Sequence, residues 1–122
     1  MLPWPGTVLD VRGRQSGATR SFPLVEARLG GDRYLVSMLG EDCNWVRNVR
    51  AADRIADLRH GRVERVRLVD VPVSARARVI KRYLAVAPGA RPHIPVDRSA
   101  DLGAFETIAA RYPVFRITHD AD

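Results

Sequence analysis

The feature that most constrains the fold is the order in which strand-like and helix-like runs follow one another along the chain. β-branched or alternating runs predict strands, and apolar residues three or four apart predict helices. Strands are expected at 7–12, 19–28, 33–39, 54–58, 62–71 and 114–117, and helices at 45–52, 74–87 and 102–112. Strands and helices do not alternate singly, which disfavours a parallel Rossmann-type sheet. The order predicts a mainly β, α+β fold: an antiparallel barrel with flanking helices.

Three local signals refine this plan. Pro23 places the second strand at a sheet edge or a bulge, because proline cannot donate a hydrogen bond to a ladder. Gly30, Gly31 and Asp32 predict a tight hairpin turn. The strand at 33–39 is apolar on both faces, which predicts a central position in the sheet.

Polar residues mark where the helices should begin. Asn44 is expected to cap the first helix and Ser74 the second. Trp45, Val49 and Ala52 recur on one helical face, which predicts that this face is buried. We therefore expect Trp45 to pack in the core, with cofactor contact as the alternative.

The chain of 122 residues is short enough to form a single domain over 1–122. Pro3, Pro5 and Gly6 predict an irregular N-terminus over 1–6, and residues 118–122 are expected to form a loose tail. The N-terminus lacks the basic and apolar regions of a signal peptide, and no apolar run approaches the length of a membrane span.

Composition limits the cellular compartment and the classes of ligand that are expected. The lone cysteine, Cys43, cannot form an internal disulfide, which suits a reducing compartment and predicts a cytoplasmic location. We expect Cys43 to act as a small buried apolar residue rather than a reactive thiol. The net charge is +6, and all but one of the basic residues are arginine. An anionic ligand is expected: a phosphorylated cofactor, a nucleic acid or a membrane surface.

The segment from Gly13 to Arg20 is the sharpest candidate for a binding site. Gly13 and Gly17 allow the backbone to approach a ligand and to turn N–H groups toward an anion. Ser16 adds a hydroxyl donor, and Arg14 and Arg20 add charge-assisted donors. The alternative is a solvated hairpin loop, which spacing alone favours because no dinucleotide or Walker fingerprint is present.

The wider pattern resembles a known family. The sequence reads VRGRQSGATRSFPL over 11–24, GGDRY over 30–34, then Ser37, Gly40 and NWVRNVRA over 44–51. This is similar to the deazaflavin-dependent nitroreductase family, F-420-dependent split β-barrel oxidoreductases related to barrels that bind flavin mononucleotide. The resemblance covers about residues 7–71.

The resemblance implies a split β-barrel that transfers hydride from a reduced deazaflavin coenzyme to an electron-poor acceptor: a quinone, an enone or a nitro-aromatic. Flavin mononucleotide is the alternative coenzyme. The residues that match the loop for the coenzyme's phosphate and acidic tail are Gly13, Arg14, Gln15, Ser16, Gly17 and Arg20. Those that match the segment along the deazaflavin ring are Ser37, Met38 and Gly40, and Trp45 and Asn48 match the helix that closes that end. Ser37 is the expected catalytic residue, stabilising charge on the acceptor oxygen.

Departures from the family keep other functions open. Relatives often carry Lys where Met38 stands, and the tyrosine-rich substrate wall of the nitroreductases has no clear counterpart. One alternative is a non-catalytic carrier of the coenzyme, a haem product or a lipid on the same barrel. Another is a basic nucleic-acid-binding barrel, which the scarcity of aromatic residues disfavours. His60, His93 and His119 lack ligand spacing, so no metal site is expected.

Overall fold

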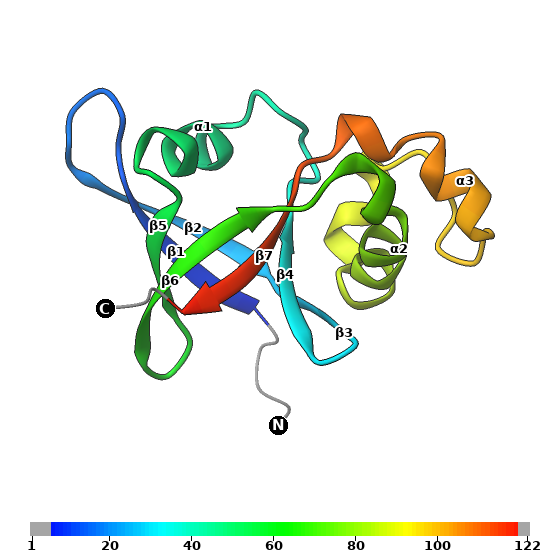
Figure 1. Ribbon diagram of the computed structural model, residues 1–122, viewed down its shortest axis with the longest axis horizontal. Helices are drawn as coiled ribbons and strands as arrows, with labels where there is room; N and C mark the ends of the chain where they lie inside the picture. Colours follow the sequence, from blue (N-terminus) through cyan, green and yellow to red (C-terminus); the bar gives the residue numbers. More distant parts are fainter. Residues whose placement is uncertain (1–5, 120–122) are drawn as a thin grey trace.

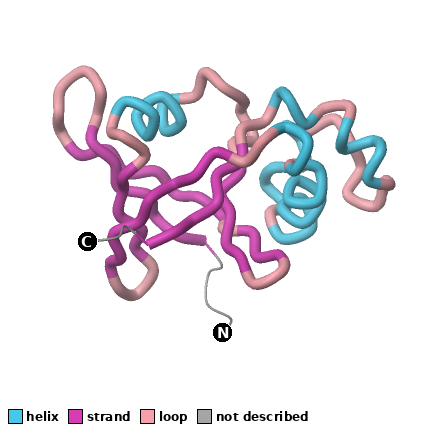
Figure 2. Tube along the Cα trace, in the orientation of Figure 1, coloured by secondary structure: helices cyan, strands magenta, loops and turns pink. Residues whose placement is uncertain are grey.

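The computed structural model describes residues 6–119 and contains a seven-stranded antiparallel sheet with flanking helices (Figures 1 and 2). The strands are β1 Gly6–Arg12, β2 Thr19–Val25, β3 Ala27–Leu29, β4 Asp32–Val36, β5 Ile55–Arg59, β6 Val63–Asp70 and β7 Val114–His119. The α-helices are α1 Asn44–Ala51, α2 Ala77–Val86 and α3 Leu102–Glu106. The 3-10 helices are η1 Val73–Ala75, η2 Pro88–His93 and η3 Ala109–Arg111. The expected α+β split barrel is confirmed.

The sheet curls into a half-barrel, and its two outermost strands are joined directly by the chain. Its strand order is β2-β1-β5-β6-β7-β4-β3, so β2 and β3 are the two outermost strands. Only Glu26 separates them in sequence, and the sheet must therefore curl until its two edges meet. Pro23 lies on an edge strand, opposite Val8, as its missing N–H predicted. Leu29 and Asp32 pair across the Gly30-Gly31 turn, which confirms the hairpin.

The inside of the barrel is one apolar core, closed at one end by α1 (Figure 1). Alternate residues of the strands point inward, for example Leu9 of β1, Leu58 of β5 and Phe115 of β7, all almost fully buried. From α1, Val46 and Val49 pack into the same core without exposed surface. The helix is therefore held by its apolar face and leaves its polar residues at the barrel mouth.

The helix α2 packs outside the barrel against β3 and β4, and α3 packs against α2 (Figure 2). Leu35 belongs to the inner core, whereas its neighbour Val36 belongs to a second core with Ile80, Leu84 and Phe105. This explains why the strand is apolar on both faces. β4 pairs with β7 on one side and β3 on the other, so it is an interior strand, as predicted.

Several predicted boundaries were wrong. β1 begins at Gly6, and β7 continues through Thr118 to His119, because cross-strand pairing orders these ends; residues 1–5 and 120–122 lie outside the described part. The strand expected to reach Leu39 stops at Val36, where the chain leaves the sheet, and Leu39 is exposed. The strand expected over 19–28 breaks at Glu26.

Two expected helix caps were also wrong. Neither Asn44 nor Ser74 caps a helix with its side chain: the residue before α1 is Cys43, and α2 follows η1 after Arg76. The helix expected over 102–112 is divided into α3 and η3. At the break, the Thr107 hydroxyl donates to a carbonyl of the preceding turn, which competes with helical hydrogen bonding.

Candidate functional site

The β1–β2 loop is held in a compact turn by its own backbone. Gly13 N–H donates to the Ala18 carbonyl at 2.8 Å, and Gly17 N–H donates to the Gly13 carbonyl at 2.9 Å. Gly17 has a φ of +77°, which L side chains rarely adopt. A Cβ on Gly13 would lie 2.9 Å from the Ala18 carbonyl oxygen, too close to accommodate. Glycine is therefore required at both positions for this loop shape.

The side chain of Arg14 is fixed by two residues of α1. Asn48 Oδ1 accepts from Arg14 Nη1 at 2.7 Å and from the Arg14 backbone N–H at 3.3 Å. Asn44 Oδ1 accepts from Arg14 Nη2 at 3.4 Å. Asn48 is 4% exposed, so the stronger of these bonds is shielded from water. The loop is thus anchored to the polar face of the helix that closes the barrel.

A small cleft of about 220 Å³ lies between the loop, β2 and α1. Its lining residues are Gly13, Arg14, Gln15, Ser16, Arg20, Phe22, Asn44 and Asn48. This lining holds two guanidinium groups and no carboxylate. Arg20 makes no ion pair with any of residues 6–119 and its side chain lies beside Gly13, so its charge is available to a ligand. The chemistry of this cleft suits an anion.

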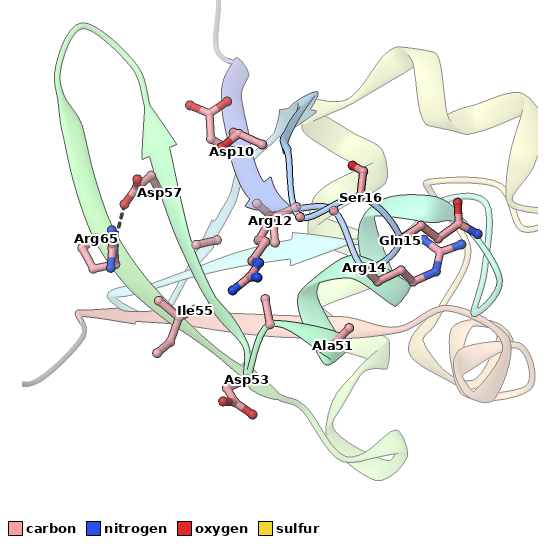
Figure 3. Close-up of a pocket in the computed structure, with 16 residues that line it drawn as sticks. Asp10, Arg12, Arg14, Gln15, Ser16, Ala51, Asp53, Ile55, Asp57 and Arg65 are labelled. Carbon is pink, nitrogen blue, oxygen red and sulfur yellow. Dashed lines mark hydrogen bonds and ion pairs between the residues drawn. The ribbon is translucent and has the colours of Figure 1, made fainter.

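A larger cleft of about 730 Å³ lies on the other side of the loop, over the outer face of β1 and β5 (Figure 3). Its lining residues are Asp10, Val11, Arg12, Gly13, Arg14, Gln15, Ser16, Gly17, Thr19, Ala51, Ala52, Asp53, Ile55, Ala56, Asp57 and Arg65. Charged side chains of both signs meet there beside a small apolar wall. The volume is that of a typical ligand pocket.

Two carboxylates of the large cleft are paired with neighbouring arginines. Asp10 accepts from Arg59 and from the Ser21 hydroxyl, and the bond from Arg59 holds the pKa of Asp10 below its ordinary value of 3.8. Asp57 accepts from Arg65 at 2.8 Å, as Figure 3 shows. The Asp10 carboxylate is accordingly ionised at neutral pH, and the Asp57 carboxylate is occupied by its bond from Arg65.

The turn from α1 into β5 forms the rim of the large cleft. Asp53 and Arg54 have φ angles of 54° and 62°, uncommon for residues other than glycine. Arg54 is tied down by Asp70, which accepts from Arg54 Nε at 2.7 Å, and the Arg54 N–H donates to the Val49 carbonyl at 2.9 Å. These bonds hold Asp53 at the cleft in a conformation that it would otherwise seldom adopt.

The segment expected along the deazaflavin ring is not part of either cleft. Ser37 has no exposed surface; its hydroxyl donates to the Gly40 carbonyl at 2.6 Å and lies 3.1 Å from the Cys43 sulfur. Met38 packs against the second core, the one that contains Val36 and Ile80. Gly40 has a φ of +91°. In this conformation the Ser37 hydroxyl therefore does not reach a ligand in either cleft.

Trp45 packs in the inner core. It is 7% exposed, and its ring lies 5.6 Å from that of Phe115, centroid to centroid. This agrees with the expectation of a core role. Cys43 is half-buried at the start of α1 and packs against the same core.

Other candidate chemistries find little support. His119 bonds Glu64 and His60 bonds the Gly6 carbonyl. Across residues 6–119, no group of three or more His, Cys, Asp or Glu side chains is arranged to hold a metal ion. No helix in the same range is long and apolar enough to cross a lipid bilayer.

Sequence reasoning missed the residues that reach the loop from elsewhere in the fold. Asn44, predicted as a helix cap, contacts Arg14 instead. Arg12 and Ile55, to which the sequence pattern assigns no role in binding, both line the large cleft. Alternation along β1 could have placed Arg12 on the outer face, but nothing local indicates that the loop folds beside it.

The family model described as F420H2-dependent quinone reductase matches residues 1–99 of the chain. No curated protein matches the chain. The resemblance to deazaflavin-dependent oxidoreductases is thereby confirmed.

Solved structures share the fold at low identity. An F420-H2 dependent reductase is 18% identical, with 97% of each chain covered and a TM-score of 0.63. A domain-swapped dimer is 19% identical, with 96% of this chain and 82% of that chain covered and a TM-score of 0.66. A heme binding protein from Mycobacterium smegmatis is 14% identical, with 95% of this chain and 46% of that chain covered and a TM-score of 0.60. At these identities the likeness concerns the fold alone.

Proposed function

The chain belongs to the F420H2-dependent quinone reductase family, and from this premise we propose that its acceptor is a quinone. It is an oxidoreductase whose coenzyme is the deazaflavin F420. Bound in its reduced form, this coenzyme supplies two electrons and a proton together, as hydride. The chain's own residues bind both reactants, orient them and restrict water.

The observation that carries the assignment of the coenzyme site is the donor set of the small cleft. Arg14, Arg20 and Asn48 surround it, and no carboxylate lines it. The phosphate and carboxylate groups of a deazaflavin tail accept hydrogen bonds and carry negative charge, so this donor set fits them. We assign the coenzyme's acidic portion to this cleft and to the backbone N–H groups of Gln15 and Ser16, because those of Gly13, Arg14 and Gly17 already form hydrogen bonds within the loop or to Asn48.

Asn48 fits this role because only one orientation of its amide is consistent with its hydrogen bonds to Arg14. Both groups of Arg14 that it meets are donors, so the Asn48 oxygen must face Arg14. The Asn48 NH₂ group then faces away from Arg14, and within residues 6–119 the bonds of this side chain run through its oxygen. No buried side-chain nitrogen in this range lacks a partner, so the NH₂ group is accessible to solvent. Since Asn48 lines the small cleft, this NH₂ group is a donor for an anionic ligand.

Arg14 is positioned before any ligand binds. A guanidinium has five N–H donors, and the two bonds to Asn44 and Asn48 leave the others for the coenzyme. Because these bonds already restrict the side chain, less conformational entropy is lost on binding. The same bonds hold the loop against α1.

We assign the acceptor to the large cleft. A quinone is a flat, mostly apolar ring with carbonyl oxygens at its ends. The cleft offers a small apolar wall from Ala51, Ala52 and Ile55, and hydrogen-bond donors from the loop on the opposite side. An apolar wall with a few polar groups is the usual composition of a pocket for a small molecule.

Ser37 has a different role in this proposal from the catalytic one expected from the sequence. Its hydroxyl bonds Gly40 and approaches Cys43, the residue before α1. The next residue, Asn44, contacts Arg14. We propose that Ser37 is a positioning residue that sets the start of α1 and, through it, the amides that hold Arg14.

Coenzyme titration followed by quinone-dependent oxidation tests this function. Reduced or oxidised deazaflavin should bind saturably and more tightly than flavin mononucleotide, and a panel of quinones, enones and nitro-aromatics should be reduced, quinones fastest. Arg14→Ala or Arg20→Ala should each weaken coenzyme binding by about 1.5–3 kcal/mol, as expected for hydrogen bonds to charged groups. Tight binding without turnover of any acceptor would instead indicate a carrier.

A further inference from the structure

We propose that Arg12 determines the acceptor specificity of the large cleft and selects quinones that carry an acidic substituent. This inference rests on the proposed function, since it assumes that the acceptor occupies that cleft. It concerns a residue outside the loop that holds the coenzyme's acidic tail. The argument depends on where Arg12 lies, on which charges surround it and on what lies beside it.

The side chain of Arg12 extends from the end of β1 into the cleft, between the loop and β5 (Figure 3). It lies alongside the loop: Arg12 Nη2 and Nε are 3.6 and 3.7 Å from where a Cβ on Gly17 would be. Both distances are ordinary van der Waals contacts, so the guanidinium lies against the loop at Gly17 and faces the space that a ligand would fill.

The charges around Arg12 leave it uncompensated. Of the carboxylates that line the cleft, Asp10 is bonded to Arg59, and Asp57 is bonded to Arg65. Asp53 is the remaining carboxylate of the lining, and within residues 6–119 neither it nor Arg12 forms an ion pair. Arg12 is exposed, so water and salt ions solvate its charge until a ligand arrives. A guanidinium in this state binds carboxylate or sulfonate, often in two-point contact.

The neighbours of Arg12 specify the rest of the ligand. Ile55 lies in the same cleft from the adjacent strand β5, and Ala51 and Ala52 come from the end of α1. A cation beside a small apolar wall suits an aromatic ring with one acidic group, and the anionic group of such an acceptor would also fix the orientation of its ring. The chemical class is therefore a quinone with a carboxylate or sulfonate substituent.

Direct binding tests the inference without turnover. Calorimetry would compare 2-naphthoate with 2-naphthamide, which share a ring and differ in charge, on the wild-type chain, Arg12→Gln and Arg98→Gln. Arg98 is an exposed arginine away from both clefts, so it controls for the lost charge. Arg12→Gln should weaken naphthoate binding about three- to tenfold, as an exposed charge-assisted bond predicts, and leave naphthamide unchanged. Arg98→Gln should alter neither. Equal effects of the two variants on naphthoate would overturn the inference.

Kinetics give the second test. The ratio of kcat/KM for 1,4-naphthoquinone-2-sulfonate to that for 1,4-naphthoquinone should fall about three- to tenfold in Arg12→Gln. Each quinone takes up one hydride and one proton and leaves as the hydroquinone. The affinity for the deazaflavin coenzyme should stay near wild type. An unchanged ratio, or a loss confined to coenzyme affinity, would refute the role of Arg12. Absence of turnover of any quinone by the wild-type chain would instead refute the proposed function.

Discussion

Replacement of Asn48 by alanine removes the contact that joins the β1–β2 loop to α1. Its Oδ1 accepts two N–H groups of Arg14, one from the guanidinium at 2.7 Å and one from the backbone at 3.3 Å. The side chain is 4% exposed, so water cannot readily replace these bonds. The substitution should therefore lower both the stability of the fold and the affinity for the coenzyme.

The two effects can be estimated separately. A hydrogen bond from a charged donor contributes about 1.5–3 kcal/mol, and alanine recovers about 0.5 kcal/mol through its helix propensity. The free energy of unfolding should fall by about 1–2.5 kcal/mol, which lowers the Tm by roughly 4–10 °C. For the coenzyme, ordering a freed Arg14 costs about 0.5–1.5 kcal/mol, and the lost Asn48 N–H donor costs about 1.5–3 kcal/mol. These costs sum to about 2–4.5 kcal/mol, so the dissociation constant should rise roughly thirty- to two-thousand-fold.

Asn48→Asp separates the two roles of this side chain. Aspartate keeps an oxygen for Arg14, so the loop should stay anchored, but it replaces the NH₂ donor by a negative charge facing the small cleft. The apo protein should melt near or above the wild-type temperature, and coenzyme binding should be lost. Thermal melting by circular dichroism and coenzyme titration by fluorescence measure the two quantities. Wild-type coenzyme affinity in Asn48→Asp would refute the assignment of the small cleft, and an unchanged Tm and affinity in Asn48→Ala would refute the anchoring role.

Three further substitutions probe the loop, the core and the opposite end of the barrel. Gly13→Ala should reduce coenzyme affinity at least tenfold in titration while the protein stays folded, because its Cβ would lie 2.9 Å from a loop carbonyl; wild-type affinity would contradict the loop geometry. Trp45→Ala should cost about 3–5 kcal/mol in denaturant unfolding, and near-normal stability with lost coenzyme binding would instead place the ring in the site. Arg33 holds the pKa of Glu64 below its ordinary value of 4.5. The stabilisation from this carboxylate is therefore complete above that value and is lost as the pH falls through the lowered pKa. Glu64→Gln should lower the free energy of unfolding by about 1–2 kcal/mol at pH 7. When unfolding is measured against pH, this difference between the variant and the wild type should disappear in acid. A difference that does not change with pH would show that the ion pair is not its source.

Local chemistry predicted much of the architecture. The Gly30-Gly31 turn, the edge position of Pro23 and the buried face of Trp45 and Val49 each follow from the backbone or side-chain properties of a few neighbouring residues. The glycines at 13 and 17 predicted a tight loop for the same reason. Errors occurred mainly at the ends of elements, where cross-strand partners or a competing side-chain hydrogen bond decide whether a residue continues the element.

The candidate ligand chemistry follows from residue types alone, because a glycine-rich loop with two arginines suits an anion wherever the fold places it. The residues that complete the site depend on how distant segments pack together. Asn48 lies 34 positions after Arg14 and meets it because α1 closes the barrel beside the β1–β2 loop. Ile55 shares a cleft with Arg12 because β5 pairs with β1, and Ser37 is buried because the chain turns behind it toward α1. Periodicity shows which face of a strand or helix a residue occupies, whereas the residues opposite that face are set by strand order and register across tens of positions.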